Sequence, residues 1–249
     1  MPRSAKVRLL LCLLALAAAG QAAAGPPYLS DDPEPTDPGH WEIYNYVIGL
    51  DSPGLAGEAG FDINYGAARN LQLTAVLPLG LENGNGVLDQ GFRGGPGVIE
   101  LAAKYKFLHQ ADGSLLPDVS FFPRVFVPTS ERFSTGRTDL WLPVWAQKDL
   151  GPWSIFGGGG YEINPGPGQD DFWQGGVALS RTFGKRISFG AEVYGQGRSA
   201  VSGGGYTAVN FGATYKLSEH WTLMGSAGPA WIEGGAHGQV FYFALKADY

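Results

Sequence analysis

The chain has 249 residues, of which 17 are Lys or Arg and 23 are Asp or Glu, so its formal net charge is −6 at pH 7. An acidic chain without basic clusters argues against nucleic acid as a partner. Glycine occurs 39 times and aromatic residues make up 13% of the chain. With little helical periodicity, this composition indicates an all-β protein.

Residues 1–24 have the organisation of a secretory signal peptide. Three basic residues precede an apolar run, Leu9–Ala19, and Ala22–Ala24 supplies the small residues of a cleavage site. The run is too short for a transmembrane anchor, which needs about 20 apolar residues. We expect cleavage near Ala24, which removes Cys12, the only cysteine, and excludes a disulfide framework.

Residues 25–38 form a segment rich in proline and aspartate, and six of these fourteen residues are Gly or Pro. Proline lacks the backbone N–H that a sheet ladder needs, so this stretch is not expected to be a strand. On composition alone, a disordered periplasmic linker is favoured.

From residue 39 to residue 249, apolar and polar side chains alternate in one segment after another. At the C-terminal end, for example, Phe243 and Leu245 fall on one parity and Lys246 and Asp248 on the other. A length of roughly seven to eleven residues suits a tilted strand that crosses a bilayer. The twelve predicted strands are 41–50, 61–65, 71–77, 99–107, 118–127, 140–148, 153–162, 172–181, 187–194, 209–216, 221–227 and 241–249.

The connections between these strands alternate in length. The five short ones are 66–70, 109–116, 149–152, 182–186 and 217–220. The six that are longer or richer in Gly and Pro are 51–57, 78–96, 128–138, 164–171, 197–205 and 228–238. Short periplasmic turns and longer extracellular loops are typical of outer-membrane barrels. Because lipid cannot satisfy backbone polar groups, a spanning sheet must close. We therefore predict a closed, antiparallel transmembrane β-barrel of about 12 strands in the outer membrane of a Gram-negative cell.

Strand parity also predicts which side chains face the lumen. The charged candidates are Glu42, Asp62, Glu100, Lys104, Arg124, Glu162 and Glu192. The aromatic candidates are Tyr44, Tyr46, Phe122, Phe126, Trp141, Trp145, Phe156 and Tyr194. One interpretation is that the charges pair with each other and only fill the barrel. The other is a narrow pathway lined by aromatic side chains, with a few charges setting selectivity.

The segment 25–38 has a second interpretation once a barrel is predicted. It could fold into the barrel mouth, where its acids would meet periplasm-side bases such as Lys104 or Lys216. Tyr28 and Leu29 would then rest on lumen aromatics. The acids in question are Asp31, Asp32 and Glu34.

The last strand ends the chain on an aromatic residue. Phe241, Phe243, Leu245 and Tyr249 share one parity, and this ending is similar to the C-terminal signal by which outer-membrane barrels are recognised for assembly. We expect the barrel-assembly machinery, outer-membrane lipid and lipopolysaccharide as partners.

Three stretches carry a resemblance to a known family. They are Pro26–Asp37 running into Gly39–Glu42, then Gly157–Gly168, and more weakly Ser218–His220 followed by Ser226–Gly228. They resemble the family named for the MetA pathway of phenol degradation, whose members are often called transporters. The resemblance implies an outer-membrane barrel, with a channel for aromatic compounds as one role. It brings no catalytic residue with it.

A search for catalytic chemistry finds no motif. None of the four histidines lies in a Ser-containing catalytic motif, and no cluster has zinc-ligand spacing. The acids of segment 25–38 lack the spacing of a calcium loop. The run Gly157–Gly160 is no phosphate loop, and we expect it to make room in the lumen or to let a neighbouring backbone approach closely. No enzyme activity, cofactor or metal is therefore predicted.

Two functions remain open at this stage. The first is a channel for passive uptake of small solutes, aromatic ones among them. The second is a closed outer-membrane barrel with a structural, adhesion or lipid-modifying enzyme role. The sequence favours the first, because aromatic side chains are predicted in the lumen and because of the family resemblance.

Overall fold

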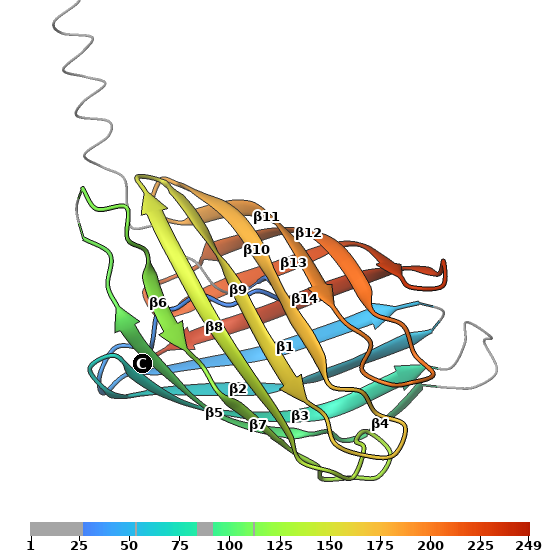
Figure 1. Cartoon of the computed structure of the whole chain (residues 1–249). Coiled ribbons are helices and arrows are strands. Elements are labelled where there is room, and N and C mark those ends of the chain that lie inside the picture. Colours follow the sequence, from blue (N-terminus) through green and yellow to red (C-terminus); the bar gives the residue numbers. More distant parts are fainter. Residues whose placement is uncertain (1–26, 53, 84–91, 112) are drawn as a thin grey trace, which may run out of the picture.

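The computed structural model describes residues 27–52, 54–83, 92–111 and 113–249. The predicted signal peptide, residues 1–24, lies outside them, as does the centre of the predicted loop 78–96. The described strands form one antiparallel sheet, which the pairing of β1 with β14 closes into a barrel (Figure 1). Among the described residues, no helix is long and apolar enough to span a membrane.

The strands occupy most of the chain from residue 41 onward. They are β1 (Trp41–Asp51), β2 (Leu55–Ala68), β3 (Leu71–Asn83), β4 (Phe92–Pro96), β5 (Ile99–Leu108), β6 (Asp118–Phe121), β7 (Arg124–Val127), β8 (Asp139–Leu150), β9 (Trp153–Ile163), β10 (Phe172–Phe183), β11 (Ile187–Gln196), β12 (Tyr206–Lys216), β13 (Trp221–Ile232) and β14 (His237–Asp248). Two passes of the chain are interrupted: β4 and β5 form one, and β6 and β7 form another. The fourteen strands therefore make the twelve passes predicted from alternation.

A proline explains the second interruption. Pro123 has no backbone N–H to give to a ladder, and it separates β6 from β7. The neighbouring residue Phe122 still donates its N–H to the carbonyl of Pro143 at 3.0 Å. Its side chain turns inward and is buried, so the break places an aromatic ring in the lumen.

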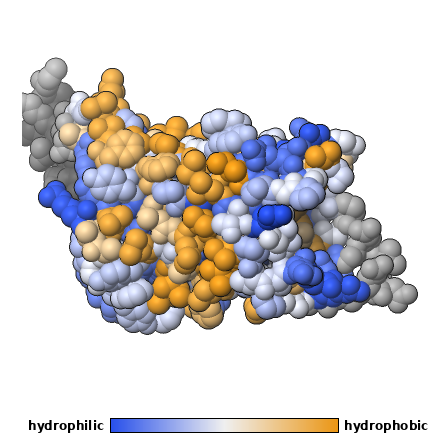
Figure 2. All heavy atoms as spheres, turned by 60° about the horizontal axis from the view of Figure 1, so that its bottom comes forward, coloured by the Kyte–Doolittle hydropathy of each residue, from blue (hydrophilic) through white to orange (hydrophobic). Residues whose placement is uncertain are grey.

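The outward faces of the strands are apolar and exposed. Mid-strand residues such as Leu73, Phe189, Phe211 and Phe243 leave about half of their surface uncovered. Figure 2 shows hydrophobic side chains gathered over the middle of one face of the wall, and hydrophilic ones towards the end that carries the loops. Such a continuous apolar surface marks a contact with lipid or with another apolar partner.

The two ends of the barrel differ. One end, the turn end, carries Trp41, Tyr249 and the connections 69–70, 109–117, 151–152, 184–186 and 217–220. The opposite end, the loop end, carries the last residue of β3, the first of β4 and the connections 52–54, 128–138, 164–171, 197–205 and 233–236. The loops 128–138, 164–171 and 197–205 have the bounds predicted from the sequence.

Three of the predicted loops are shorter than expected, because strands extend into glycine- and proline-rich sequence. Residues 51–57 reduce to 52–54, 228–238 reduces to 233–236, and 78–96 loses residues 78–83 to β3 and 92–96 to β4. Pro229 is accommodated because it lies at an interruption of the β12–β13 ladder, between the pairs Ala208–Ala230 and Phe211–Ala227. Composition alone marks such a residue as a breaker, although the ladder can omit one bond.

Candidate functional site

Residues 27–38 cross the interior of the barrel, and we call them the lumen segment. At its start the hydroxyl of Ser226 on β13 donates to the carbonyl of Pro27. At its end Pro38 forms an isolated bridge with Gly66 on β2, after which β1 begins. The disordered linker favoured by composition is therefore wrong for these residues, because their polar and apolar groups find partners on the lumen wall.

Glycines on the inward face of the wall make the room for the start of the segment. Gly190 on β11 pairs with Gly212 on β12, which pairs with Ser226 on β13. A Cβ atom on Gly212 would lie 2.8 Å from the ring of Tyr28. A Cβ atom on Gly176 of β10 would likewise lie only 2.6 Å from the hydroxyl oxygen of Ser30. The missing side chains thus form a groove, which we call the glycine wall.

Tyr28 fills this groove. Its ring packs against that of Phe156 with centroids 5.8 Å apart, and Ala178 completes the buried cluster. Its hydroxyl donates to the carbonyl of Gly212 at 3.3 Å. The aromatic contact predicted for Tyr28 is therefore present.

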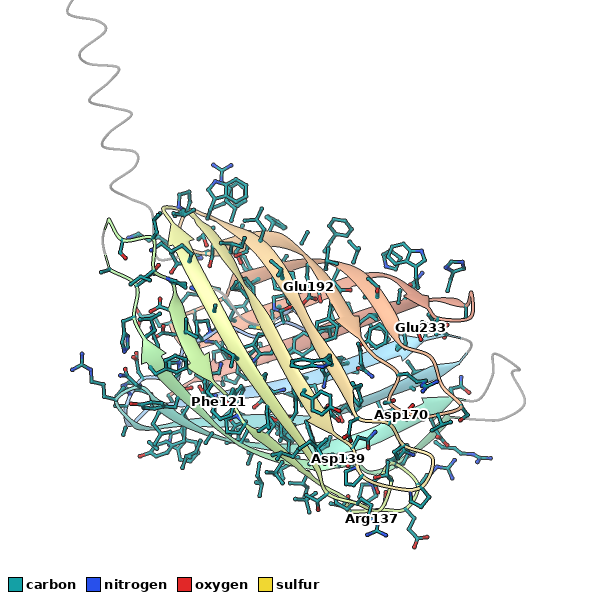
Figure 3. The ribbon with its side chains drawn as sticks, viewed as in Figure 1. Phe121, Arg137, Asp139, Asp170, Glu192 and Glu233 are labelled. Atoms are coloured by element: carbon teal, nitrogen blue, oxygen red, sulfur yellow. The ribbon has the colours of Figure 1, made fainter. Side chains whose placement is uncertain are left out.

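Glu192 holds the segment through its backbone. Its carboxylate accepts hydrogen bonds from the N–H groups of Leu29 at 3.1 Å and Ser30 at 2.5 Å, and from Asn210 Nδ2 at 2.8 Å. The residue is 1% exposed. Figure 3 shows Glu192 within the barrel, whereas Asp170 and Glu233 lie at the loop end. Glu192 thus faces inward as its parity predicted, but it lies under the segment and not along an open path.

The opposite wall holds the segment by charge, and we call it the charged wall. Lys104 Nζ on β5 lies 3.0 Å from Asp31 and 3.8 Å from Asp32. Arg124 on β7 lies 3.6 Å from Asp31 and 3.1 Å from Glu100 on β5. Lys104, one of the two predicted bases, is therefore a partner of the segment.

The third acid has a partner that the sequence did not indicate. Glu34 pairs with Lys106, which also lies 3.0 Å from Asp118. Lys216, the other predicted base, lines a cavity beside β12 and is not among the described ion-pair partners of the segment. Lys106 lies two residues after Lys104 on the same strand, so strand parity also places its side chain in the lumen and could have identified it as a partner.

Aromatic rings support the bases of the charged wall. Arg124 lies over the ring of Phe122 at 4.5 Å and over that of Trp141 at 5.0 Å, and Lys104 lies over Phe122 at 4.8 Å. Trp145 meets Trp141 edge to face at 5.8 Å and is fully buried. These rings lower the cost of keeping two cations inside the barrel.

Asp32 has an altered acidity because it is enclosed by the barrel. Burial raises the pKa of its carboxyl to about 7, while the ammonium group of Lys104 acts in the opposite direction. The nearby carboxylates of Asp31 and Glu42 raise the pKa further. Protonation of this one group therefore changes the charge of the segment near neutral pH.

The remaining predicted lumen residues are distributed along the interior. Glu42 lies 3.5 Å from Lys246 and accepts the hydroxyl of Tyr44 at 3.0 Å. Asp62 accepts a hydrogen bond from Asn64 at 2.9 Å, and Glu162 accepts one from Gln174 at 2.5 Å. No group of three or more His, Cys, Asp or Glu in the described part of the chain could hold a metal ion.

An outer cavity of about 320 Å³ lies between the segment and the loop end. Five tyrosines line it: Tyr28, Tyr44, Tyr194, Tyr206 and Tyr242. Trp141 also lines this cavity, whereas Trp145 packs against Trp141 and Phe122 and does not line it. Tyr206 and Tyr242 were not singled out from the sequence, although Tyr242 stands on the mixed face of the last strand, which was assigned no role.

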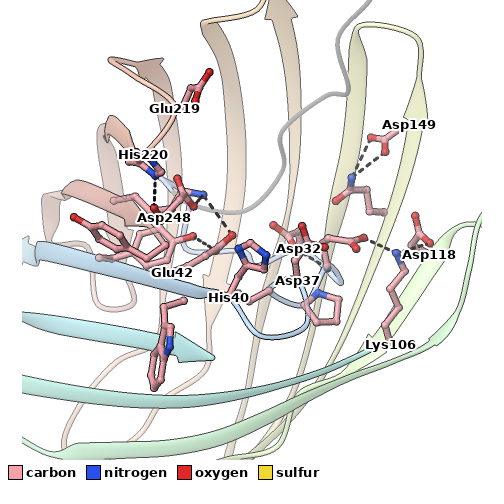
Figure 4. A pocket seen from close by; sticks show the side chains of 18 of the residues that line it. Asp32, Asp37, His40, Glu42, Lys106, Asp118, Asp149, Glu219, His220 and Asp248 are labelled. Carbon is pink, nitrogen blue, oxygen red and sulfur yellow. Dashed lines mark hydrogen bonds and ion pairs between the residues drawn. The ribbon is translucent and has the colours of Figure 1, made fainter. Parts of the chain in front are cut away.

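A larger cavity of about 840 Å³ opens between the segment and the turn end. His40, His109 and His220, three of the four histidines, line it. Figure 4 shows His40 and His220 beside acids from several strands. The two cavities share four lining residues: Asp32, Glu34, Glu42 and Tyr44. The segment therefore separates two hollow parts of one lumen.

The predicted assembly residues face outward at the seam between β1 and β14. Phe243 and Tyr249 are more than half exposed, and Phe241 stands in line with them on the same face. The backbone of Tyr249 exchanges hydrogen bonds with that of Trp41 at 2.7 and 2.9 Å, which fastens the turn end of the seam.

The comparisons with known proteins find similarity in structure but not in sequence. No family model matches the chain, and no curated protein matches it. A crystal structure of an outer membrane channel from Pseudomonas putida F1 is similar over 91% of this chain and 100% of that one, with a TM-score of 0.71 and 13% identity. The monoaromatic hydrocarbon channel CymD is similar over 86% of this chain and 89% of its own, with a TM-score of 0.50 and 9% identity. The chain thus has the barrel fold of outer-membrane channels, which is the fold that the family resemblance implies.

Proposed function

We propose that this chain is an outer-membrane channel for passive uptake of small solutes, and that the lumen segment is its constriction. One observation carries the proposal: a cavity lies on each side of the segment, and both reach the same four residues, Asp32, Glu34, Glu42 and Tyr44. A solute that moves past the segment would go from one cavity to the other without leaving the barrel.

Placement in an outer membrane is supported by the exterior of the barrel. The exposed apolar wall, in which every described strand except β4 has at least two neighbours, suits a lipid environment in which backbone groups find no water. The predicted signal peptide would supply export. The two similar solved structures are described as outer-membrane channels.

The outer cavity suits a neutral aromatic solute. A dry cavity of about 150 Å³ is enough for a benzene ring, and this one is about 320 Å³. Tyrosine rings offer faces and edges for offset or edge-on stacking. The five carboxyl-bearing residues in its lining exceed its two bases, which disfavours anions. The similar channel CymD is described as one for monoaromatic hydrocarbons.

Reconstitution tests this proposal. The purified barrel in planar bilayers should give a small single-channel conductance. Relative to protein-free liposomes, liposomes that contain it should gain more in the entry rate of phenol than in that of benzoate, an aromatic anion of similar size. Deleting residues 27–37 should leave a folded barrel with a larger conductance. Absence of conductance and of any increase in solute entry over protein-free liposomes, in the full chain and in the deletion variant, would instead support a closed barrel with a structural, adhesion or lipid-modifying role.

A further inference from the structure

The outward face of the wall carries charge at few places. In the described strands, the outward-facing charged residues are Asp51, at the loop end of β1, and Lys148 and Arg181, both near the turn end. Partners in an antiparallel ladder point to the same face. Arg181 pairs with Trp153 and Phe189, and Lys148 pairs with Ile155. All three of these partners are exposed on the apolar exterior.

Arg181 is fixed in place by aromatic rings and not by an acid. Its guanidinium carbon lies 5.1 Å from the ring centre of Trp153 and 4.8 Å from that of Phe183. No ion pair joins it to a carboxylate of the described residues. Its five donors therefore remain available on a surface that is otherwise apolar.

Lys148 stands on the other side of β9 from Arg181. Its ammonium group donates to the carbonyl of Leu116 at 3.2 Å, in the turn 109–117. The neighbouring residue Asp149 does not neutralise it, because that carboxylate accepts hydrogen bonds from Gln110 and Gln147 on the inner side. The two bases thus flank the first residues of β9 without an acid between them.

The position of this pair along the barrel is that of a membrane interface. Trp153 begins β9, and β10 ends two residues after Arg181. Lys185 and Arg186 follow in the exposed turn 184–186. In the turn 109–117, Leu115 is 97% exposed, which suits an apolar anchor. Aromatic rings and bases gathered near one end of the strands are typical of the headgroup region.

We infer that Lys148 and Arg181, with Trp153 between them, bind the phosphate of a net-negative phospholipid in the periplasmic leaflet. The inference rests on the proposed location in the outer membrane. A planar guanidinium matches two phosphate oxygens, and its aromatic neighbours keep it oriented while lipid excludes water. The excess of bases over acids in the patch favours an anionic lipid over a zwitterionic one, which carries its own cation.

Lipid retention tests the site. Barrels are reconstituted in nanodiscs of equimolar phosphatidylglycerol and phosphatidylcholine, released, and analysed by native mass spectrometry for bound lipid. The wild-type chain should retain phosphatidylglycerol in excess. Lys148→Gln and Arg181→Gln should each lower that excess about fivefold, the effect of one interfacial base. Trp153→Leu should lower it as well, because the guanidinium loses an aromatic support.

Two controls define the result. Arg69→Gln removes an exposed base from the turn between β2 and β3, outside the patch, and should leave the excess unchanged. An excess of inorganic phosphate alone should not displace the lipid, because the acyl chains contribute to binding. Heat-modifiable mobility on gels verifies that each variant folds.

The inference is overturned if the Lys148→Gln, Arg181→Gln double variant retains phosphatidylglycerol as the wild type does, or if Arg69→Gln has an equal effect. Conductance of the same preparations separates this result from the channel proposal. A barrel that conducts but shows no lipid preference contradicts the phospholipid site alone. One that prefers phosphatidylglycerol but never conducts contradicts the channel alone.

Discussion

The two walls that hold the lumen segment do so by different physical means. On the glycine wall, Gly176, Gly190 and Gly212 leave space, and Tyr28 occupies it in a largely apolar setting. On the charged wall, Lys104 and Arg124 attract carboxylates of the segment across short distances. One side is complementary in shape and the other in charge.

The two walls therefore differ in what disturbs them: the glycine wall is sensitive to a change in shape, and the charged wall to a change in charge. A groove made by missing side chains does not depend on pH, but one added methyl group blocks it. An array of buried ion pairs tolerates small changes in shape, but it weakens when one of its bases is removed, and its strength varies with pH where a buried carboxyl titrates. Variants on the two walls should therefore respond differently to the same solution conditions.

One readout serves all variants. Ser30 is fully buried, so a cysteine placed there should be protected from maleimide while the segment is docked and should react when the segment is released. Cys12 is the only native cysteine, and Cys12→Ala removes it. The labelling rate of Ser30→Cys in the folded barrel then reports the fraction of released segment.

The largest effect is expected on the charged wall. Lys104→Met leaves Asp31 and Asp32 buried with less positive charge, and losing one partner of a buried ion pair costs about 3–5 kcal/mol. Labelling at position 30 should rise by at least two orders of magnitude at pH 8. The charge-preserving variant Lys104→Arg is the control and should stay close to the wild type. Equal protection in Lys104→Met and Lys104→Arg would show that charge does not hold this side.

The second effect is expected on the glycine wall. In Gly212→Val, the atoms nearest to the new Cβ all belong to the segment, namely to Pro27 and Tyr28. Overpacking costs about 1–3 kcal/mol, so labelling should rise roughly ten- to a hundredfold at any pH. Gly195→Val is the matched control on β11, because a Cβ there meets nothing nearer than 3.9 Å. A labelling rate unchanged by Gly212→Val would contradict the groove.

Alternation was enough to predict the barrel, because every strand must present one apolar face over its whole length. It also assigned inward parity to Lys104, Arg124 and Glu192 correctly, since parity is a local property. The strand ends were less predictable. Pro229 looks like a loop residue until the ladder that omits it is known.

The lumen segment could not be predicted from local pattern. Its prolines favour disorder, and what overrides them is contact between Asp31 and residues more than seventy positions away. Gly190 and Gly212 both stand at inward positions of predicted strands, which was a usable signal. Their adjacency, however, depends on the register across the loop 197–205, which the sequence does not specify.

The third prediction concerns pH and isolates the charged wall. The pKa of Asp32 is about 7 in the docked segment, against about 3.9 in solvent, so docking takes up a proton. This contribution is fully present below the solvent value and is lost as pH rises through about 7. Labelling at position 30, normalised to the unfolded chain, should therefore increase between about pH 5 and about pH 8. Asp32→Asn should remove most of this dependence, and a wild-type rate flat across that interval would contradict it.

The smallest effect on labelling is expected from a variant of Tyr28, which rests on the glycine wall. Tyr28→Phe removes one hydrogen bond, from the hydroxyl to the carbonyl of Gly212 at 3.3 Å, and leaves the ring in its groove. Such a bond contributes about 1 kcal/mol, so labelling should rise about fivefold. Because no charge changes, the ratio of the Tyr28→Phe labelling rate to the wild-type rate should be the same at low and high pH. Combined with Asp32→Asn, on the opposite side of the lumen, the two free-energy changes should add to within about 0.5 kcal/mol. A ratio that varies with pH, or a clear departure from additivity, would mean that the two walls do not hold the segment independently.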